Sequence, residues 1–241
     1  MKRWFALGFL VTVPAHGIVN TEPLRYDLEK DHHAGKISGS FGGKDGNTRG
    51  LFLDMSVFAG FLSEPHLGFL DASGEYAQFD GEIKDQNSFL HLRYNYRPLS
   101  WMHPEVFGQL ETDRFRDLKL RALIGTGPRF VLVKEFLFFG SAYMLEHETE
   151  NDEKILSHRW SNYLSIYWNL DEVTVANTFY YQPRFDKFSD YRLLDSATIE
   201  TELGKRFSSG VSFVIKSDSQ PPSGVLSLDW EVLNTFSLHL F

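Results

Sequence analysis

The sequence of 241 residues carries 32 acidic and 24 basic side chains, and this net charge of −8 argues against a nucleic-acid partner. It has no cysteine, so disulfides do not stabilise it, and no segment approaches the 18 consecutive apolar residues of a transmembrane helix. Aromatic residues make up 15% of the chain, although its mean hydropathy is only −0.26. This combination is typical of a membrane β-barrel, whose strands need apolar residues only at every second position.

Residues 1–17 have the layout of a signal peptide. Two basic residues precede an apolar stretch that is too short to cross a bilayer. Ala15 and Gly17 then supply the small residues that stand three and one positions before a cleavage site. We therefore predict export with cleavage near Gly17, followed by a polar periplasmic leader over 18–33.

Twelve stretches of strand length follow this leader, separated by residues that favour turns. They cover 34–43, 48–62, 66–80, 87–99, 101–113, 118–132, 135–147, 155–169, 173–184, 191–206, 210–217 and 225–241. Most of them alternate with period two: in 87–99, for example, Leu92 and Tyr94 share one face while Arg93 and Asn95 share the other. A helix would need a period of 3.6. We predict an all-β fold, an antiparallel transmembrane β-barrel of about 12 strands over 34–241.

The connections between these strands alternate in length. Every second connection is short: 63–65, 98–100, 133–135, 170–172 and 207–210. The others are mostly longer and more polar: 44–47, 80–86, 113–117, 147–154, 184–191 and 217–224. Outer-membrane barrels place short turns in the periplasm and long loops outside the cell. This pattern predicts a location in the cell outer membrane, in contact with its lipids, with the longer connections exposed on the cell surface.

Several short motifs resemble those of a known family. They are KDGNTRG at 44–50, Tyr94 and Tyr96 before a turn, a hairpin that starts at Asp113-Arg114-Phe115 and continues through 118–127, and the final PPSGVLSLDWEVLNTFSLHLF. Together they resemble the YdiY-like family of unknown function, whose members are labelled salt-induced outer-membrane proteins. The resemblance implies a barrel, and the family label alone implies a link to salt or osmotic stress. It implies no chemistry, because the family has no established activity.

The sequence ends on Phe241, which we expect to act as a C-terminal assembly signal for the barrel-assembly machinery. In most such barrels the terminal Phe shares a face with apolar residues two, four and six positions before it. Here those positions hold His239, Ser237 and Thr235, whereas the apolar residues on the opposite face are Leu240, Leu238 and Phe236. A slip of one residue inverts the faces of a strand. Either the final strand carries a bulge or Phe241 points inward.

The sequence shows no convincing site for catalysis, cofactors or metals. Nine histidines include no pair with metal-ligand spacing in one strand, and we expect His32 and His33 to be solvated in the leader. A lipid hydrolase site could draw on Ser157, Ser161 and Glu146, but His158 alternates with Ser157 and should face the other way. We therefore predict that the protein is not an enzyme and binds no cofactor or metal.

Charged and polar side chains on the predicted inner face form three neighbouring rows. The rows are Arg93 and Arg97, then Glu105, Gln109, Glu111 and Asp113, then Lys119, Arg121 and Arg129. Basic, acidic and basic rows on adjacent strands can pair across the sheet, and isolated charges in a narrow lumen would be costly. This network either fills and stiffens the barrel or lines a small pore.

Three functions remain open at this point. The leading interpretation is an outer-membrane barrel without enzymatic activity that is structural or weakly conducting. The second is a narrow channel for small polar solutes or ions, favoured by the charged inner face. The third, an outer-membrane lipid hydrolase, lacks a serine and a histidine on one face.

Overall fold

The structure, a computed structural model, describes residue 18 and residues 20–44, 50–114, 118–150, 153–204, 206–221 and 226–240. The predicted signal peptide over 1–17 and the predicted assembly signal at Phe241 lie outside the described residues. No helix in the described part of the chain is long and apolar enough to cross a membrane.

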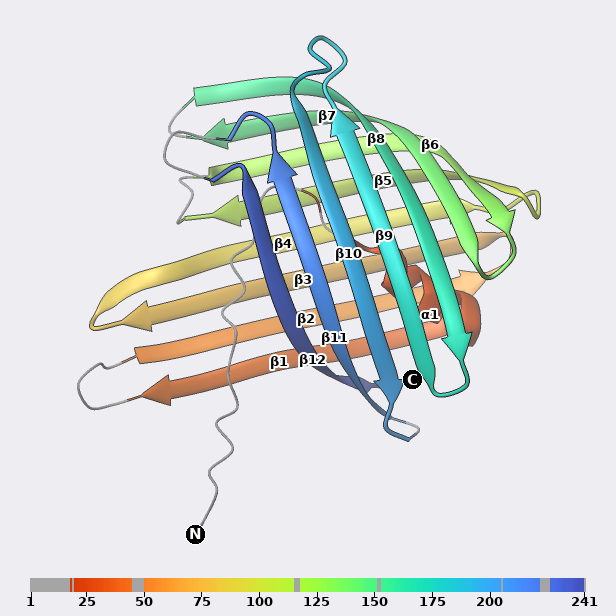
Figure 1. Cartoon of the computed structure of the whole chain (residues 1–241), viewed down its shortest axis with the longest axis horizontal. Coiled ribbons are helices and arrows are strands. Elements are labelled where there is room, and N and C mark those ends of the chain that lie inside the picture. Colours follow the sequence, from red (N-terminus) through yellow and green to blue (C-terminus); the bar gives the residue numbers. More distant parts are fainter. Residues whose placement is uncertain are drawn as a thin grey trace.

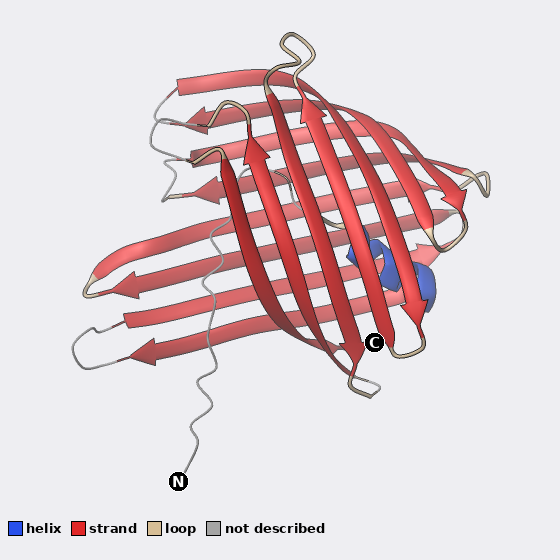
Figure 2. Cartoon of the chain, viewed as in Figure 1, coloured by secondary structure: helices blue, strands red, loops and turns tan. Residues whose placement is uncertain are grey.

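Twelve antiparallel strands form one closed barrel, which confirms the predicted fold class (Figures 1 and 2). Each strand pairs with its neighbours in sequence, and β1 pairs with β12 to close the wall. The strands are β1 His33–Lys44, β2 Gly50–Ser63, β3 His66–Phe79, β4 Glu82–Tyr96, β5 Met102–Asp113, β6 Leu118–Val133, β7 Leu137–Glu150, β8 Glu153–Leu170, β9 Val173–Pro183, β10 Tyr191–Glu202, β11 Phe207–Asp218 and β12 Leu228–His239.

The predicted alternation corresponds to the two faces of the wall. In β4, Leu92 is 52% exposed whereas the adjacent Arg93 is 7% exposed. In β8, Leu164 is exposed and Ser165 is buried, as expected from the sequence. The outside of the barrel therefore presents apolar side chains, and the inside collects polar ones. An exterior rich in apolar side chains suits a bilayer, because lipid rather than water then covers it.

Two predicted connections are wrong because the strands extend further than expected. The segment 80–86 belongs largely to β4, and the chain reverses in a tight turn at Asp80 and Gly81. Both turn residues have positive φ angles, 51° and 83°, which Asp and Gly tolerate and which fit a tight hairpin turn. At 147–154, β7 likewise continues to Glu150 and β8 begins at Glu153. Strands β4, β7 and β8 thus include residues that were expected to form polar loops.

A third connection is displaced along the chain. Residues 207–210, predicted as a turn, start β11 instead. The reversal lies between Glu202 and Phe207, where Gly204 has a φ angle of 90°. The longest fully described connection, 184–190, and residues 219–221 after β11 lie together at one end of the barrel, called here the loop end.

The phase of the final strand is now defined over its described residues. Phe236 is 64% exposed, and Leu238 also lies on the exposed face, whereas Ser237 is buried. The pairing of β12 with β11 runs from Leu228 to Leu238 without a register shift. Among the described residues of β12 there is therefore no bulge, and its apolar residues at even positions face outward.

A helix that was not predicted lies inside the barrel. Helix α1, Glu22–Asp31, occupies the end of the barrel where β1 begins and β12 finishes, called here the helix end (Figure 1). Pro23 lies in its first turn, where a missing backbone N–H costs nothing, and Glu22 places a negative charge at the positive end of the helix. The leader 18–33 thus contains an ordered element, and its His32 and His33 are exposed.

Close approach of the helix to the wall depends on Gly60 in β2. Leu28 of α1 is completely buried in a cluster with residues such as Phe58, Leu67 and Phe69 of the wall. A Cβ atom at Gly60 would lie 2.6 Å from Leu28 Cδ1, which is closer than real Cβ contacts. The absence of a side chain at Gly60 therefore makes room for the helix.

Candidate functional site in the barrel lumen

Arg25 connects α1 to the opposite wall of the barrel. Its guanidinium lies 2.9 Å from Glu105 of β5 and 3.4 Å from Glu22 of the helix itself, and it donates a 3.3 Å hydrogen bond to the Tyr163 hydroxyl in β8. The side chains of Arg25 and Glu105 are both almost inaccessible to water. Removing a charged side chain from water costs on the order of several kcal/mol, so a buried charge needs partners of opposite charge or hydrogen bonds.

Glu22 and Glu29 of α1 bind arginines from β6 and from β4 or the end of β4. Glu22 lies 3.4 Å from both Arg93 and Arg129. Glu29 lies 3.5 Å from Arg129 and 3.2 Å from Arg97. Together with Arg25 and Glu105, these residues are called here the helix cluster. The helix is therefore held by ion pairs on one side and by the apolar contacts of Leu28 on the other.

Aromatic contacts add to the fixation of the helix. Tyr26 of α1 stacks on Tyr167 of β8 with ring centroids 4.8 Å apart. Arg129 places its guanidinium 3.9 Å from the ring centroid of Phe138 in β7. Both arrangements are favourable by geometry, and the cation–π contact is buried and so little weakened by water.

A second group of charges fills the lumen toward the loop end. Glu146 of β7 is fully buried and receives hydrogen bonds of 2.9 and 3.0 Å from Arg192 of β10, with Arg159 and Arg121 at 3.4 and 3.5 Å. Glu148 pairs with Arg192 at 3.1 Å and with Arg121. These five residues, with Glu111, Asp190 and Asp218, are called here the loop-end cluster.

The loop-end cluster also anchors the connection between β9 and β10. In the segment after β9, Arg184 lies 2.7 Å from Asp186 and 3.3 Å from Asp190, which itself pairs with Arg159 at 3.1 Å. The hydrogen bond from Arg184 lowers the pKa of the Asp186 carboxyl below its usual value. The ion pairs thus continue from the lumen into the connection between β9 and β10.

The predicted inner rows on β4 to β6 are mostly buried, but they pair only in part with one another. Arg93 lies 3.7 Å from Glu105, and Arg121 lies 3.3 Å from Glu111. Gln109 is buried, with its amide oxygen 3.3 Å from His91 and its amide nitrogen 3.5 Å from Glu111, and Asp113 is also buried. Arg97 and Arg129 instead pair with the helix, which sequence reasoning did not place in the lumen.

Lys119 differs from the other predicted lumen residues. Its side chain is exposed, because the pairing of β6 with β7 shifts register between Leu118 and Leu120. An irregularity of this kind changes the face to which a side chain points. The expectation that Lys119 continues the inner row of Arg121 and Arg129 is therefore corrected.

Sequence reasoning did not combine Glu146, Glu148, Arg159 and Arg192 into a network. The signal was present, because period-two alternation alone places Arg159 and Arg192 on the polar faces of their strands. Their meeting depends on a closed wall: β7 and β10 are separated by two strands in sequence order, yet Arg192 reaches Glu146 across the lumen.

The residues considered for hydrolysis do not assemble. Ser157 is buried, whereas His158 is exposed and forms a hydrogen bond with Tyr143 on the outer face. Glu146 is occupied by arginines. Within the described residues, no group of three or more His, Asp and Glu side chains is arranged to hold a metal ion.

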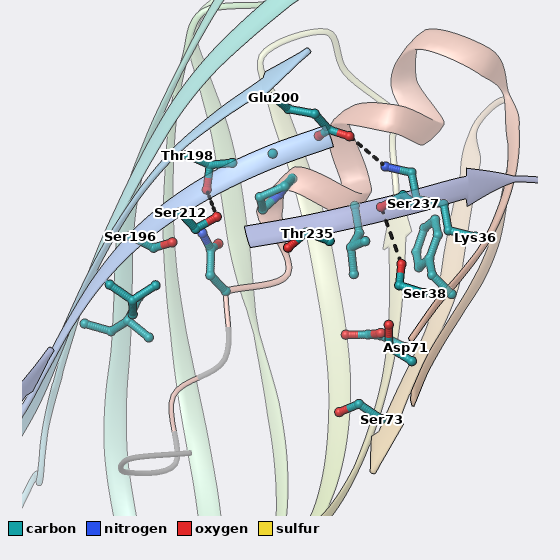
Figure 3. A pocket seen from close by; sticks show the side chains of 18 of the residues that line it. Lys36, Ser38, Asp71, Ser73, Ser196, Thr198, Glu200, Ser212, Thr235 and Ser237 are labelled. Atoms are coloured by element: carbon teal, nitrogen blue, oxygen red, sulfur yellow. Dashed lines mark hydrogen bonds and ion pairs between the residues drawn. The ribbon is translucent and has the colours of Figure 1, made fainter. Parts of the chain in front are cut away.

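A cavity of about 380 Å³ occupies the part of the lumen that the clusters leave open (Figure 3). It lies against Pro23 and Leu24 of α1 and is otherwise bounded mainly by β10–β12 and β1–β3. Hydroxyl groups dominate its polar lining: Ser38, Ser56, Ser73, Ser196, Thr198, Ser212, Thr235 and Ser237. Its charged lining residues are Lys36, Asp71, Glu200 and Lys216.

The polar groups of the cavity differ in how they are paired. Lys36 lies 3.7 Å from Glu200, Ser38 lies 3.4 Å from Ser237, and the hydroxyls of Thr198 and Ser212 are 2.8 Å apart (Figure 3). These contacts link neighbouring strands without filling the space between them. The cavity therefore offers hydroxyl donors and acceptors to water or to a small polar solute.

Comparison with known proteins supports the same fold. The family model described as "Protein of unknown function, DUF481" matches residues 68–238. A search of curated proteins finds no match. Among solved structures, the KdgM porin is similar with a TM-score of 0.51 and 10% identity, over 87% of this chain and 99% of the porin. The translocator domain of the autotransporter NalP from Neisseria meningitidis has a TM-score of 0.50 and 9% identity, over 92% of this chain and 95% of that domain.

Proposed function

This chain belongs to the DUF481 family of proteins of unknown function, and we propose that it is a narrow outer-membrane channel for small polar solutes or ions, without enzymatic activity. The observation that carries the proposal is the hydroxyl-lined cavity beside α1. Its volume of about 380 Å³ lies at the lower end of the roughly 300–1,000 Å³ common for small-molecule sites. The solutes are accordingly small.

The uneven filling of the lumen supports a restricted passage. Strands β4–β8 direct their buried charges into the helix cluster and the loop-end cluster, which pack closely. The cavity lies on the opposite side, where the inner faces carry mostly Ser and Thr. A solute would pass along the hydroxyl-lined side. A path through the two clusters would have to separate ion pairs and leave buried charges without partners.

The proposal includes export and membrane insertion. The signal-peptide layout of 1–17, the apolar exterior and the shared fold with the KdgM porin support a location in the cell outer membrane. The barrel-assembly machinery and outer-membrane lipids are the partners that such an insertion requires. A role in salt or osmotic stress rests on the YdiY-like resemblance alone.

To test the channel, the purified protein is inserted into planar lipid bilayers that separate two potassium chloride solutions, and the conductance is recorded. We expect small, discrete conductance steps from the native protein. Thr198→Phe should lower the step size severalfold, because Thr198 lines the cavity. Ile199→Phe is the matched control, since Ile199 is 55% exposed on the outer face of the same strand, and it should leave the steps unchanged.

A structural barrel without conductance is the second candidate, and it is favoured by the ion pairs and the helix that occupy much of the lumen. It predicts folded, inserted protein with no steps above the bilayer background. The absence of conductance steps would contradict the channel, provided that the mobility of the unboiled protein on a gel shows that it is folded.

A further inference from the structure

The geometry points to Asp71 as the group that makes this lumen selective for small monovalent cations, an inference that rests on the proposed channel. Asp71 belongs to β3 and lines the cavity together with Ser73 of the same strand (Figure 3). Its neighbours on the inner face are Phe69 and Ser73, one apolar and one polar. The carboxylate is thus presented to the open part of the lumen.

Asp71 differs from the other charged residues of the cavity in having no partner. Lys36 and Glu200 pair with each other, and Lys216 also has an interaction within the chain. Among the described residues, no side chain forms a hydrogen bond or an ion pair with the carboxylate of Asp71, which remains available to a mobile ion.

A row of serines lies next to this carboxylate. Ser38 of β1 is in register with Ser237 of β12 and with Ser56 of β2, and Ser56 is in register with Ser73 of β3. Side chains in register on neighbouring strands lie about 4.5–5.5 Å apart at Cβ. The four hydroxyls therefore form a continuous polar band across the wall that ends two residues from Asp71.

This band and the carboxylate supply the chemistry of a cation pathway. Hard cations prefer oxygen ligands, and hydroxyl oxygens can replace part of the water shell of an ion in a narrow space. Acidic side chains that face a pore favour cations and repel anions, and a low-dielectric wall strengthens both effects. Alkali cations such as K⁺ fit the site better than anions, because the two lysines of the lining already have interactions within the chain whereas the carboxylate of Asp71 faces the cavity without a partner among the described residues.

The test is the reversal potential in planar bilayers that separate concentrated from dilute potassium chloride. The native protein should favour K⁺ over Cl⁻, and Asp71→Asn should lower this permeability ratio severalfold while it keeps measurable conductance. Asp71→Glu, which retains the negative charge, should keep the preference for K⁺ over Cl⁻. Asp195→Asn is the control, because Asp195 alternates with the cavity residues Leu194 and Ser196 on β10 and binds Asn177 instead.

The outcomes separate this inference from the proposed channel. Conductance without a cation preference in the native protein would overturn the role of Asp71 and leave the channel intact. An unchanged ratio in Asp71→Asn would do the same. If neither the native protein nor Asp195→Asn conducts, the channel and its selectivity are both overturned.

Discussion

Glu105 lies where the helix contacts the wall, and its surroundings show how burial determines the contribution of an ion pair to stability. Its carboxylate has contacts with Arg25 at 2.9 Å and Arg93 at 3.7 Å and accepts a 3.1 Å hydrogen bond from Asn95. On the exterior, Glu135 and Lys134 form a pair of similar length, 3.1 Å, but both side chains are at least three-quarters exposed. Water screens the second pair and not the first.

Glu105→Gln removes the negative charge while it keeps the shape of the side chain. We expect a loss of about 3–5 kcal/mol in the free energy of unfolding, because two buried arginines lose part of their compensation. Glu135→Gln should change it by about 0–1 kcal/mol, the range of exposed pairs. Urea unfolding in lipid vesicles measures both values. Equal effects would show that the helix cluster is not a stabilising network.

At the scale of a single strand, alternation divides β2 into a lipid face and a lumen face. Val57 is 41% exposed on the outer face, whereas the adjacent Ser56 lines the cavity. The same strand also contains Gly60, which admits α1. One strand thus contributes to the membrane surface, to the cavity and to the seat of the helix, because successive side chains point to opposite faces.

Arginine substitutions at these two neighbours test the faces directly. Val57→Arg places a charge among lipid chains near the middle of the strand, and we expect it to reduce stability by about 2–4 kcal/mol. Ser56→Arg instead enters an open polar cavity that is also lined by the carboxylate of Asp71, so its effect should be much smaller. The two variants are folded into lipid vesicles, and the folded fraction of each is compared by the gel mobility of unboiled samples. A stronger defect in Ser56→Arg than in Val57→Arg would indicate inverted faces.

For the whole molecule, the even number of strands fixes the orientation of every connection. The wall begins with β1 and finishes with β12 at the helix end, so the five hairpin connections β2–β3, β4–β5, β6–β7, β8–β9 and β10–β11 also lie there. The connection of residues 184–190 lies at the loop end. In the proposed outer-membrane location, the usual orientation of such barrels leads us to expect residues 184–190 on the outside of the cell.

The absence of native cysteine allows this orientation to be mapped with single thiols. Lys187→Cys lies in the connection at the loop end, and Glu172→Cys lies in the β8–β9 turn at the helix end; both side chains are exposed. A maleimide that does not cross membranes should label Lys187→Cys on intact cells, and Glu172→Cys only after lysis. Labelling of Glu172→Cys on intact cells would reverse the topology.

The sequence by itself determined the class of fold and the two faces of its strands, because both follow from local alternation. The inward positions of Arg93, Glu105, Arg121 and Arg129 follow from the same rule. Local patterns also predicted connections that are too long, since the polar residues at 82–86, 147–150 and 153–154 belong to strands.

The tertiary structure alone decided how the lumen is filled. A helix of ten residues with charges on several sides gives no sign in the sequence of where it is buried, and its position depends on Leu28, on Gly60 and on arginines far away in the chain. The pairing of Arg192 with Glu146 and the row of serines beside Asp71 likewise require barrel closure and register. Contacts across a lumen are set by the whole wall, and no local pattern encodes them.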